Sequence, residues 1–429
     1  MFSLTRRIKK IYKMVETEER KVVMSNFASL SVLQAITYLL PVIILPYLFR
    51  VIGPEKFGLI SFAQAFVQYF MILTDYGFSI SATKEISLCR EEDERVCSIF
   101  SSVMTVKISL ALLSLLALGM IVYFIPKFRQ DWLVYVLSFG MVIGNTIFPV
   151  WFFQGMERMK HIAHLNIIGC IIYVLSIFFF VRERQDYLMV PIITSCVFLA
   201  TGVLGLRVVF KRFGVSFKFP GYTNIRQQLK AGWDIFISNV AINAYTNTRI
   251  FTIGLLTSNT TTGLYSIAEK IANLAQTFPL ASFSQAVFPR LSKIFHKNKM
   301  KALELMQKIQ QVTINIALIC LPLIFIFAPL IVRIVCGVKY PETVLCLRLL
   351  LIAVFCVISN AFRVQFLLVC GKTHIYSRIH IVMALVGLPL MFLLIYSFSS
   401  VGAAIATIII EAGILGITYA TIKRFSFSS

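Results

Sequence analysis

The chain has 429 residues, of which 58% are hydrophobic and only 14% are charged, and its formal net charge is +22. A soluble globular domain averages about 25% charged residues, and apolar runs near 20 residues recur here, so the sequence predicts an integral membrane protein. The alternating pattern of a membrane β-barrel is absent, which favours helices as the spanning elements. Most basic residues lie in short loops between apolar runs, which argues against a nucleic-acid partner.

The first 26 residues are basic and amphipathic, and they lack the apolar run and cleavage site of a signal peptide. We expect them to form a cytoplasmic arm that lies on anionic lipid. Beyond the arm, apolar runs predict twelve spans and therefore an all-α polytopic membrane fold. The spans cover about 27–49, 57–80, 101–125, 132–154, 163–181, 187–206, 233–256, 263–289, 309–335, 344–370, 379–396 and 401–421.

Lysine and arginine are distributed unevenly between the loops on the two sides. Roughly four times as many lie in the segments that are cytoplasmic if the N-terminus is inside as in the opposite loops, so both termini are predicted to be cytoplasmic. The predicted outer loops are very short. They leave no room for catalytic groups at the outer face, so we expect no enzyme, and a polysaccharide polymerase or membrane glycosyltransferase is disfavoured.

An internal repeat divides the chain. Residues 58–64 (GLISFAQ) resemble residues 263–269 (GLYSIAE) at an offset of 205, and both copies open spans that run in the same direction. The halves are therefore predicted to be parallel six-helix bundles around a central cavity, an arrangement that rocks to give alternating access. The predicted organisation is an arm at 1–26, an N-terminal bundle at 27–210, a cytoplasmic linker at 211–232, a C-terminal bundle at 233–424 and a tail at 425–429.

Three predicted spans carry polar stripes at helical spacing. Their members are Gln64, Gln68 and Asp75 in the second span, Asn239, Asn243, Thr246 and Arg249 in the seventh, and Glu269, Asn273 and Gln276 in the eighth. Two interpretations stay open. The stripes either line a shared cavity or form hydrogen bonds between helices, which contribute about 0.6 kcal/mol each.

Six basic residues lie inside the predicted spans, where an uncompensated cation costs about 3 kcal/mol. They are Lys107, Arg249, Lys270, Arg333, Arg348 and Arg363. Such residues usually face a bundle interior or a watery cavity, so their presence favours a protein that handles an anion. Arg333 and Arg348 lie near outer span ends, where we expect them to be interfacial.

Arg249 is the first candidate for an anion-binding residue, followed by Arg363 and Lys107. Arginine offers a planar, permanently charged fork that matches phosphate or carboxylate. Arg249 has no acidic residue one turn away, so it either meets an anion or pairs across helices with Glu269, Asp75 or Glu411. Lys107 can instead extend toward the inner surface, and Lys270 can be compensated by the adjacent Glu269.

Short motifs at loops and helix ends are the most distinctive parts of the sequence. They are LPYLFRVIGPEKFG at 45–58, TDYGF at 74–78, TKEIS at 83–87, WFFQGME at 151–157, YSIAEKI at 265–271 and FPRLS at 288–292. In this order they resemble the motifs of Wzx-type polysaccharide flippases. These flippases belong to the multidrug/oligosaccharidyl-lipid/polysaccharide exporter superfamily.

The resemblance implies that an undecaprenyl-diphosphate-linked oligosaccharide, such as an O-antigen or capsule repeat unit, is flipped from the cytoplasmic to the periplasmic leaflet of a bacterial inner membrane. Together with the stripes and buried cations, it gives a candidate substrate-binding set of Arg249, Arg363, Lys107, Lys270, Asn243, Asn273 and Gln68. It also implies coupling to H⁺ or Na⁺, with Asp75, Glu269 and Glu411 as candidates. No other cofactor and no metal site is expected.

The expected partners are the lipid-linked oligosaccharide and membrane lipids, with a polysaccharide polymerase and a chain-length regulator as further candidates. The main alternative is a cation-coupled drug antiporter of the same fold, which should favour an acidic, aromatic cavity. A structural assembly protein also stays open, although it leaves the buried cations unexplained.

Overall fold

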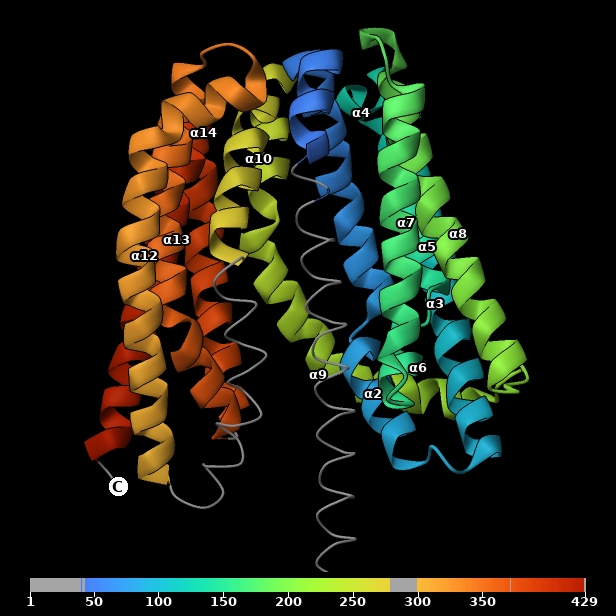
Figure 1. Ribbon diagram of the computed structural model, residues 1–429. Coiled ribbons are helices and arrows are strands. Elements are labelled where there is room, and N and C mark those ends of the chain that lie inside the picture. The colour runs from blue at the N-terminus through green and yellow to red at the C-terminus, as the bar shows by residue number, and fades with distance from the viewer. Residues whose placement is uncertain (1–39, 41–42, 278–298, 371, 428–429) are drawn as a thin grey trace, which may run out of the picture.

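The computed structural model describes residues 40, 43–277, 299–370 and 372–427, and these residues are helical apart from short connections (Figure 1). The first helical stretch covers 43–75, and the stretch before α12 covers 259–277. The other helices are α2 (Phe78–Leu88), α3 (Asp93–Phe124), α4 (Pro126–Gln130), α5 (Trp132–Ile147), α6 (Val150–Gly155), α7 (Met159–Phe180), the 3₁₀ helix η1 (Arg184–Leu188), α8 (Met189–Arg212), α9 (Tyr222–Thr246), α10 (Thr248–Leu256), α12 (Lys299–Cys336), α13 (Pro341–Val369) and α14 (Thr373–Phe427).

Eight helical stretches within the described ranges are long and apolar enough to cross a membrane. The stretches Ile43–Leu88 and His374–Lys423 have 46 and 50 residues, whereas about 20 residues span a bilayer. Each contains a sharp turn, at Gly53 with φ 77° and at Ser399 with φ 54° and ψ −134°. The left-handed Gly53 ends one helix, and Pro54 after it suits the start of the next. The predicted all-α polytopic fold is confirmed.

The predicted spans from 57–80 to 401–421 coincide with helical stretches, except for 278–289 of the eighth span. That part, the arm at 1–26 and most of the first span lie outside the described residues. Helix 259–277 and α9 are more polar than the eight membrane candidates. The polarity of 259–277 follows from its position beside the central cavity described below, whereas the polar residues of α9 are concentrated in its first half, where Gln228 contacts Glu85.

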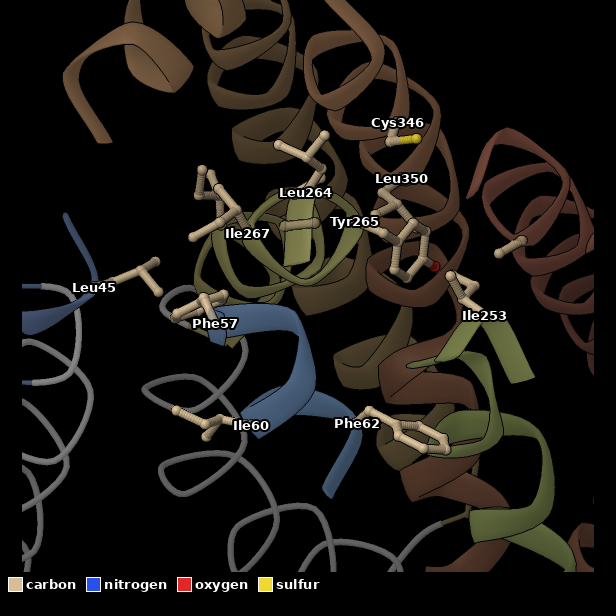
Figure 2. Packing of buried hydrophobic residues seen from close by; sticks show 14 of the residues in the cluster. Leu45, Phe57, Ile60, Phe62, Ile253, Leu264, Tyr265, Ile267, Cys346 and Leu350 are labelled. Atoms are coloured by element: carbon tan, nitrogen blue, oxygen red, sulfur yellow. The ribbon is translucent and has the colours of Figure 1, made fainter. Parts of the chain in front are cut away.

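Two separate hydrophobic cores organise the molecule. The larger core joins the two halves of the chain, and Figure 2 shows Phe57, Ile60 and Phe62 near residues of 259–277 and α13. Within it, the Phe62 ring stacks on Phe251 of α10, with ring centroids 5.5 Å apart. The smaller core belongs mainly to the first half and includes Phe100 and Trp151. The halves are thus packed together at the end of the predicted outer loops.

Helix α9 connects the halves and contacts both. Its start packs on α2 and α3, and its later turns pack on α14; in Figure 1 it runs obliquely from the α2 end of the molecule toward α10. Gln228 of α9 donates a hydrogen bond to Glu85 Oε2 at 2.7 Å. Gly77, with φ 79°, lies so close to α9 that a Cβ atom there would be 2.8 Å from Ile235. The predicted linker at 211–232 therefore extends into a helix held by the first half.

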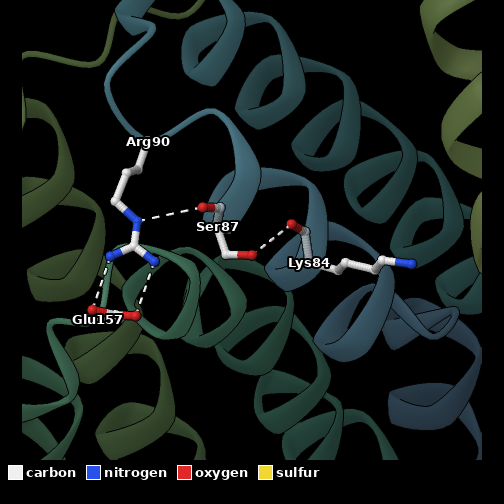
Figure 3. Close-up of polar contacts among 4 residues, drawn as sticks. All are labelled: Lys84, Ser87, Arg90 and Glu157. Atoms are coloured by element: carbon white, nitrogen blue, oxygen red, sulfur yellow. Dashed lines mark hydrogen bonds and ion pairs between the residues drawn. The ribbon is translucent and has the colours of Figure 1, made fainter.

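A polar cluster at the predicted cytoplasmic end joins α2 to the turn between α6 and α7 (Figure 3). The Arg90 guanidinium pairs with both carboxylate oxygens of Glu157, at 2.8 and 2.9 Å. Hydrogen bonding from Arg90, and then its charge, hold the pKa of the Glu157 carboxyl below its usual range. This contact fixes the predicted inner edge of the first half.

Candidate functional site

A cavity of about 720 Å³ lies between the two halves of the chain. Its wall comes from the helices at 43–75 and 259–277 and from α9, α10, α13 and α14. The polar side chains in the wall are Ser61, Gln64, Gln68, Thr246, Asn247, Arg249, Ser266, Glu269, Lys270, Asn273, Gln276, Asn360, Gln365, Tyr376, His380, Thr407 and Glu411. The stripes predicted on the second and eighth spans therefore face this space through Gln64, Gln68, Glu269, Asn273 and Gln276.

Arg249 lies at the start of α10, just after the chain turns at Asn247 between α9 and α10. Its Nε is 2.9 Å from Glu269 Oε1, and it also donates to the Thr246 carbonyl oxygen at 3.1 Å. The side chains of Arg249 and Glu269 are only 15% and 7% exposed. Of the three carboxylates considered from sequence, Glu269 is therefore the one that forms an ion pair with Arg249 in the structure. Both residues nevertheless belong to the cavity wall.

The ionisable residues of the wall are two cations, Arg249 and Lys270, two carboxylates, Glu269 and Glu411, and His380. Lys270 Nζ lies 5.3 Å from the centroid of the Phe57 ring, which gives it a cation–π contact. Among the described residues, the charges of Arg249 and Lys270 balance those of the two carboxylates when both are ionised and His380 is neutral. An excess of positive charge in this part of the chain requires a proton on one carboxyl group or on His380.

Four of the candidate residues from sequence lie outside the cavity wall in the described structure. Lys107 is buried inside the first half, where Nζ is 3.4 Å from the Asn145 carbonyl oxygen. Asp75 accepts a hydrogen bond from Ser79 at 3.0 Å. Asn243 donates to the Asn239 carbonyl oxygen at 2.8 Å. Arg363 lies between α13 and α14, with Cζ 5.4 Å from the centroid of the Tyr419 ring.

Sequence reasoning missed part of the wall contributed by α14. Tyr376 and His380 line the cavity with ring centroids 4.3 Å apart, and Thr407 lies one turn from Glu411. The signal was present, because each pair is four residues apart and therefore shares a helix face. Tyr376 was assigned to the connection between two predicted spans, and Thr407 lies in a strongly apolar span, so only Glu411 of these four residues was identified from sequence.

Small residues close the cavity at the predicted outer end. Gly58 and Gly263, which are equivalent in the repeat, face each other: a Cβ atom on Gly58 would be 1.7 Å from the Asn259 carbonyl oxygen, and one on Gly263 would be 2.1 Å from that of Pro54. The next equivalent pair, Ser61 and Ser266, shares a hydrogen bond of 3.0 Å. The pseudo-twofold axis therefore passes between these helices, where the absence of side chains permits close backbone contact.

Two cations of the first half strengthen this closure. Lys127 Nζ donates to the carbonyl oxygens of Leu255 and Thr257, at 2.9 and 3.3 Å. Arg50 Nε donates to the carbonyl oxygen of Val335 at 3.3 Å, and its Nη2 contacts that of Ile334. These acceptors lie at the C-terminal ends of α10 and α12, where a cation is favoured by the helix dipole. We refer to the Lys127 and Arg50 contacts as the two outer latches.

A family model described as "Polysaccharide biosynthesis protein" matches residues 23–295, which is more than half of the chain. The chain belongs to the polysaccharide biosynthesis protein family. This family member is 30% identical over 395 residues to a protein of Escherichia coli (strain K12) named "Putative O-antigen transporter", covering 90% of this chain and 93% of that one. It is 24% identical to the "Probable low-salt glycan biosynthesis flippase Agl15" of Haloferax volcanii, with 83% and 74% covered.

Solved structures show how this polysaccharide biosynthesis family member folds. It superposes on lipid II flippase MurJ in an inward closed conformation with a TM-score of 0.76 at 14% identity, covering 92% of this chain and 87% of that one. An inward-facing multidrug resistance MATE family transporter of the MOP superfamily gives a TM-score of 0.73 at 12% identity, with 90% and 96% covered. The resemblance to Wzx-type flippases is therefore confirmed for family and fold.

Proposed function

We propose that this protein flips an undecaprenyl-diphosphate-linked oligosaccharide, an O-antigen or capsule repeat unit, from the cytoplasmic to the periplasmic leaflet of a bacterial inner membrane. The observation that carries the proposal is the polar, charged cavity between the two halves of a polysaccharide biosynthesis family member. The names of the curated relatives, transporters and a flippase, support transport without catalysis. A volume of about 720 Å³ lies in the range of small-molecule sites, about 300–1,000 Å³.

In this mechanism, the cavity wall replaces the water around the substrate headgroup. Arg249 and Lys270 attract the diphosphate, and the amides of Gln68 and Asn273 replace hydrogen bonds from water to the sugars. The lipid tail stays in the bilayer while the headgroup occupies the cavity. Without such a wall, a diphosphate would have to enter hydrocarbon as an uncompensated charge.

Alternating access is supported by a difference between the two ends of the cavity. The outer latches and the Gly58–Gly263 contact close the predicted periplasmic end, while the wall extends past Gln276 at mid-depth to Tyr376 at the predicted cytoplasmic end. A higher TM-score with the inward-facing MATE structure than with the outward-facing one, 0.73 against 0.61, supports an inward-facing state. Both termini are cytoplasmic in the proposed orientation.

Ion coupling is a further part of the proposal. Glu269 and Glu411 lie in the wall, whereas Asp75 does not, so the two glutamates are the stronger candidates for binding H⁺ or Na⁺. A proton on either carboxyl would leave the wall with one net positive charge, which suits an anionic headgroup. Coupling through Glu411 would leave the Arg249–Glu269 ion pair intact.

The decisive experiment removes the cavity cation and controls for its ion pair. Arg249→Ala should abolish surface polysaccharide in cells in which this chain is the only copy of the transporter. Because removing one partner of a buried pair costs about 3–5 kcal/mol, membrane levels must be measured for each variant. The double variant Arg249→Ala with Glu269→Gln removes the orphaned charge, and it should insert normally while export stays absent.

Arg90→Ala is the matched control, because Arg90 also pairs with a glutamate but lies at the surface, away from the cavity. Arg249→Lys tests the fork, since it keeps the charge but loses bidentate binding of phosphate. Normal polymer in the double variant would exclude Arg249 from substrate binding.

A cation-coupled drug antiporter is the second candidate function. The two carboxylates of the wall, Glu269 and Glu411, and the Tyr376–His380 aromatic pair favour it. The two candidates differ in a direct test: an antiporter should change cellular resistance to cationic drugs, whereas a flippase should change only surface polysaccharide. A polysaccharide polymerase and a chain-length regulator are proposed partners, to be tested by crosslinking in cells.

A further inference from the structure

Arg363 lies on the side of α13 that faces away from the cavity. With 3.6 residues per turn, it shares a helix face with Ile352 and Leu345, which lie about three and five turns earlier. Their side chains are 45% and 46% exposed, as expected for residues that contact lipid. Residues of α13 that line the cavity, such as Ala361 and Gln365, lie on the opposite face. Arg363 is therefore directed toward the membrane surface of the second half.

The surroundings of Arg363 provide aromatic and backbone contacts but no opposite charge. Its guanidinium lies over the ring of Tyr419, which is 54% exposed, and it donates to the Ser359 carbonyl oxygen. Across the ranges that the structure describes, no carboxylate lies within ion-pair distance of Arg363. A permanent cation therefore lies beside an exposed aromatic ring without a matching carboxylate in the same part of the chain.

The depth of Arg363 suggests where such an anion lies. Arg363 precedes the end of α13 at Val369 by six residues, or about 9 Å. The 29 residues of α13 extend about 43 Å, which matches a whole bilayer of about 40–45 Å including its headgroups. Arg363 thus lies near the boundary between hydrocarbon and headgroups, on the predicted cytoplasmic side. A long arginine side chain at this depth reaches the headgroup phosphates.

We propose that Arg363 and Tyr419 form a binding site for the phosphate of an anionic phospholipid in the inner leaflet. The arginine fork suits phosphate, and the exposed tyrosine is typical of the membrane interface. The site differs from the cavity in position and in ligand, since it takes a membrane lipid and no cargo. It joins α13 to α14, so a bound lipid stabilises two helices of the cavity wall from outside.

The test uses the purified full-length protein and measures phosphatidylglycerol binding in detergent by native mass spectrometry. Arg363→Gln should weaken the tightest phosphatidylglycerol site roughly tenfold, the factor expected for losing a charged hydrogen bond. Arg363→Lys should fall between wild type and Arg363→Gln, because a point charge keeps the attraction without the fork. A melting temperature for each variant without added lipid establishes that it is folded.

Arg348→Gln is the matched control. Arg348 also lies on α13, stacks on an aromatic ring, that of Phe325, at 5.0 Å and donates to a backbone carbonyl, but it lies at the predicted outer end. Its loss should change phosphatidylglycerol binding less than twofold. Equal binding by wild type and Arg363→Gln, or an equal loss in Arg348→Gln, overturns the proposal. Competition by millimolar inorganic phosphate would instead indicate a free-phosphate site and overturn the lipid assignment. Because no cargo is present, the outcome does not depend on the proposed flippase function.

Discussion

Replacing Gly58 by alanine should open the predicted outer end of the protein. The added Cβ atom would lie 1.7 Å from the Asn259 carbonyl oxygen, whereas ordinary contacts begin near 3.4 Å. Both clashing groups are backbone, so no side-chain rotation relieves the overlap. The two helices must separate by about 1.7 Å, which is enough to break the 3.0 Å hydrogen bond between Ser61 and Ser266.

The energetic effect follows from this separation. Overpacking of a tight contact costs about 1–3 kcal/mol, and loss of one neutral hydrogen bond adds about 0.5–1.5 kcal/mol. These costs raise the free energy of the state with a closed outer end only, because the two helices are separated in the state with an open outer end. Since about 1.4 kcal/mol changes a ratio of populations tenfold, Gly58→Ala should raise the open population at least tenfold.

Distances between spin labels at Gln130 and Lys339 report this change, because both residues are exposed and lie on different halves at the predicted outer end. The native cysteines must first be replaced. Gly119→Ala is the control, since a Cβ atom there meets nothing within 4 Å. A Gly58→Ala distance distribution that overlays the wild-type distribution would refute the role given to this contact. By the repeat symmetry, Gly263→Ala should behave like Gly58→Ala.

Three further predictions follow from other contacts. Removing both outer latches, with Arg50→Ala and Lys127→Ala, should lengthen the distance between the spin labels, as Gly58→Ala does, because each latch provides charged hydrogen bonds worth about 1.5–3 kcal/mol. An unchanged distance would mean that the latches do not hold the closed state. The Arg249→Ala and Glu269→Gln double variant should recover membrane levels lost in Arg249→Ala, as measured by immunoblot, and a level no better than the single variant's would contradict a buried ion pair. Because the pKa of Glu157 is lowered in the folded state, the Arg90–Glu157 pair should stabilise the fold at a pH above the ordinary glutamate pKa of about 4.5, and this contribution should be lost as the pH falls. The melting temperature should therefore depend less on acid pH in Arg90→Ala than in wild type. Parallel pH dependences in the two proteins would count against the pair.

The sequence predicted the helices well because the bilayer permits few alternatives. Every backbone group in hydrocarbon must be paired within its own segment, so apolar length locates most of the spans, although 259–277 and α9 are more polar than the others. The repeat was equally informative. Residues 58–64 and 263–269 are similar in sequence, and in the structure their members Ser61 and Ser266 lie in direct contact. Polar stripes identified part of the wall, including Gln64, Gln68, Glu269, Asn273 and Gln276, because polar residues on an otherwise apolar helix are rarely exposed to lipid.

The rotation of apolar helices could not be predicted in the same way. Lipid is as apolar as a protein core, so α13 shows no difference in polarity between the face with Ile352 and the buried face. Arg363 was predicted to face the cavity, yet the structure places Asn360 and not Arg363 in the wall. Similarly, the sequence allowed three carboxylates as partners of Arg249. The choice of Glu269 depends on how α10 packs beside 259–277, which no local pattern encodes.

The outer latches show how duplicated halves can acquire different tasks. Arg50 donates a latch bond, whereas its counterpart at the repeat offset of 205, Leu255, supplies a backbone acceptor to Lys127. A main-chain acceptor places no demand on the side chain at its position. The side chains at Leu255 and Val335 can therefore be exchanged without loss of a donor or acceptor, whereas each latch requires its own cation in the first half. Closure of the outer end thus depends on the side chains of one repeat and only on the main chain of the other.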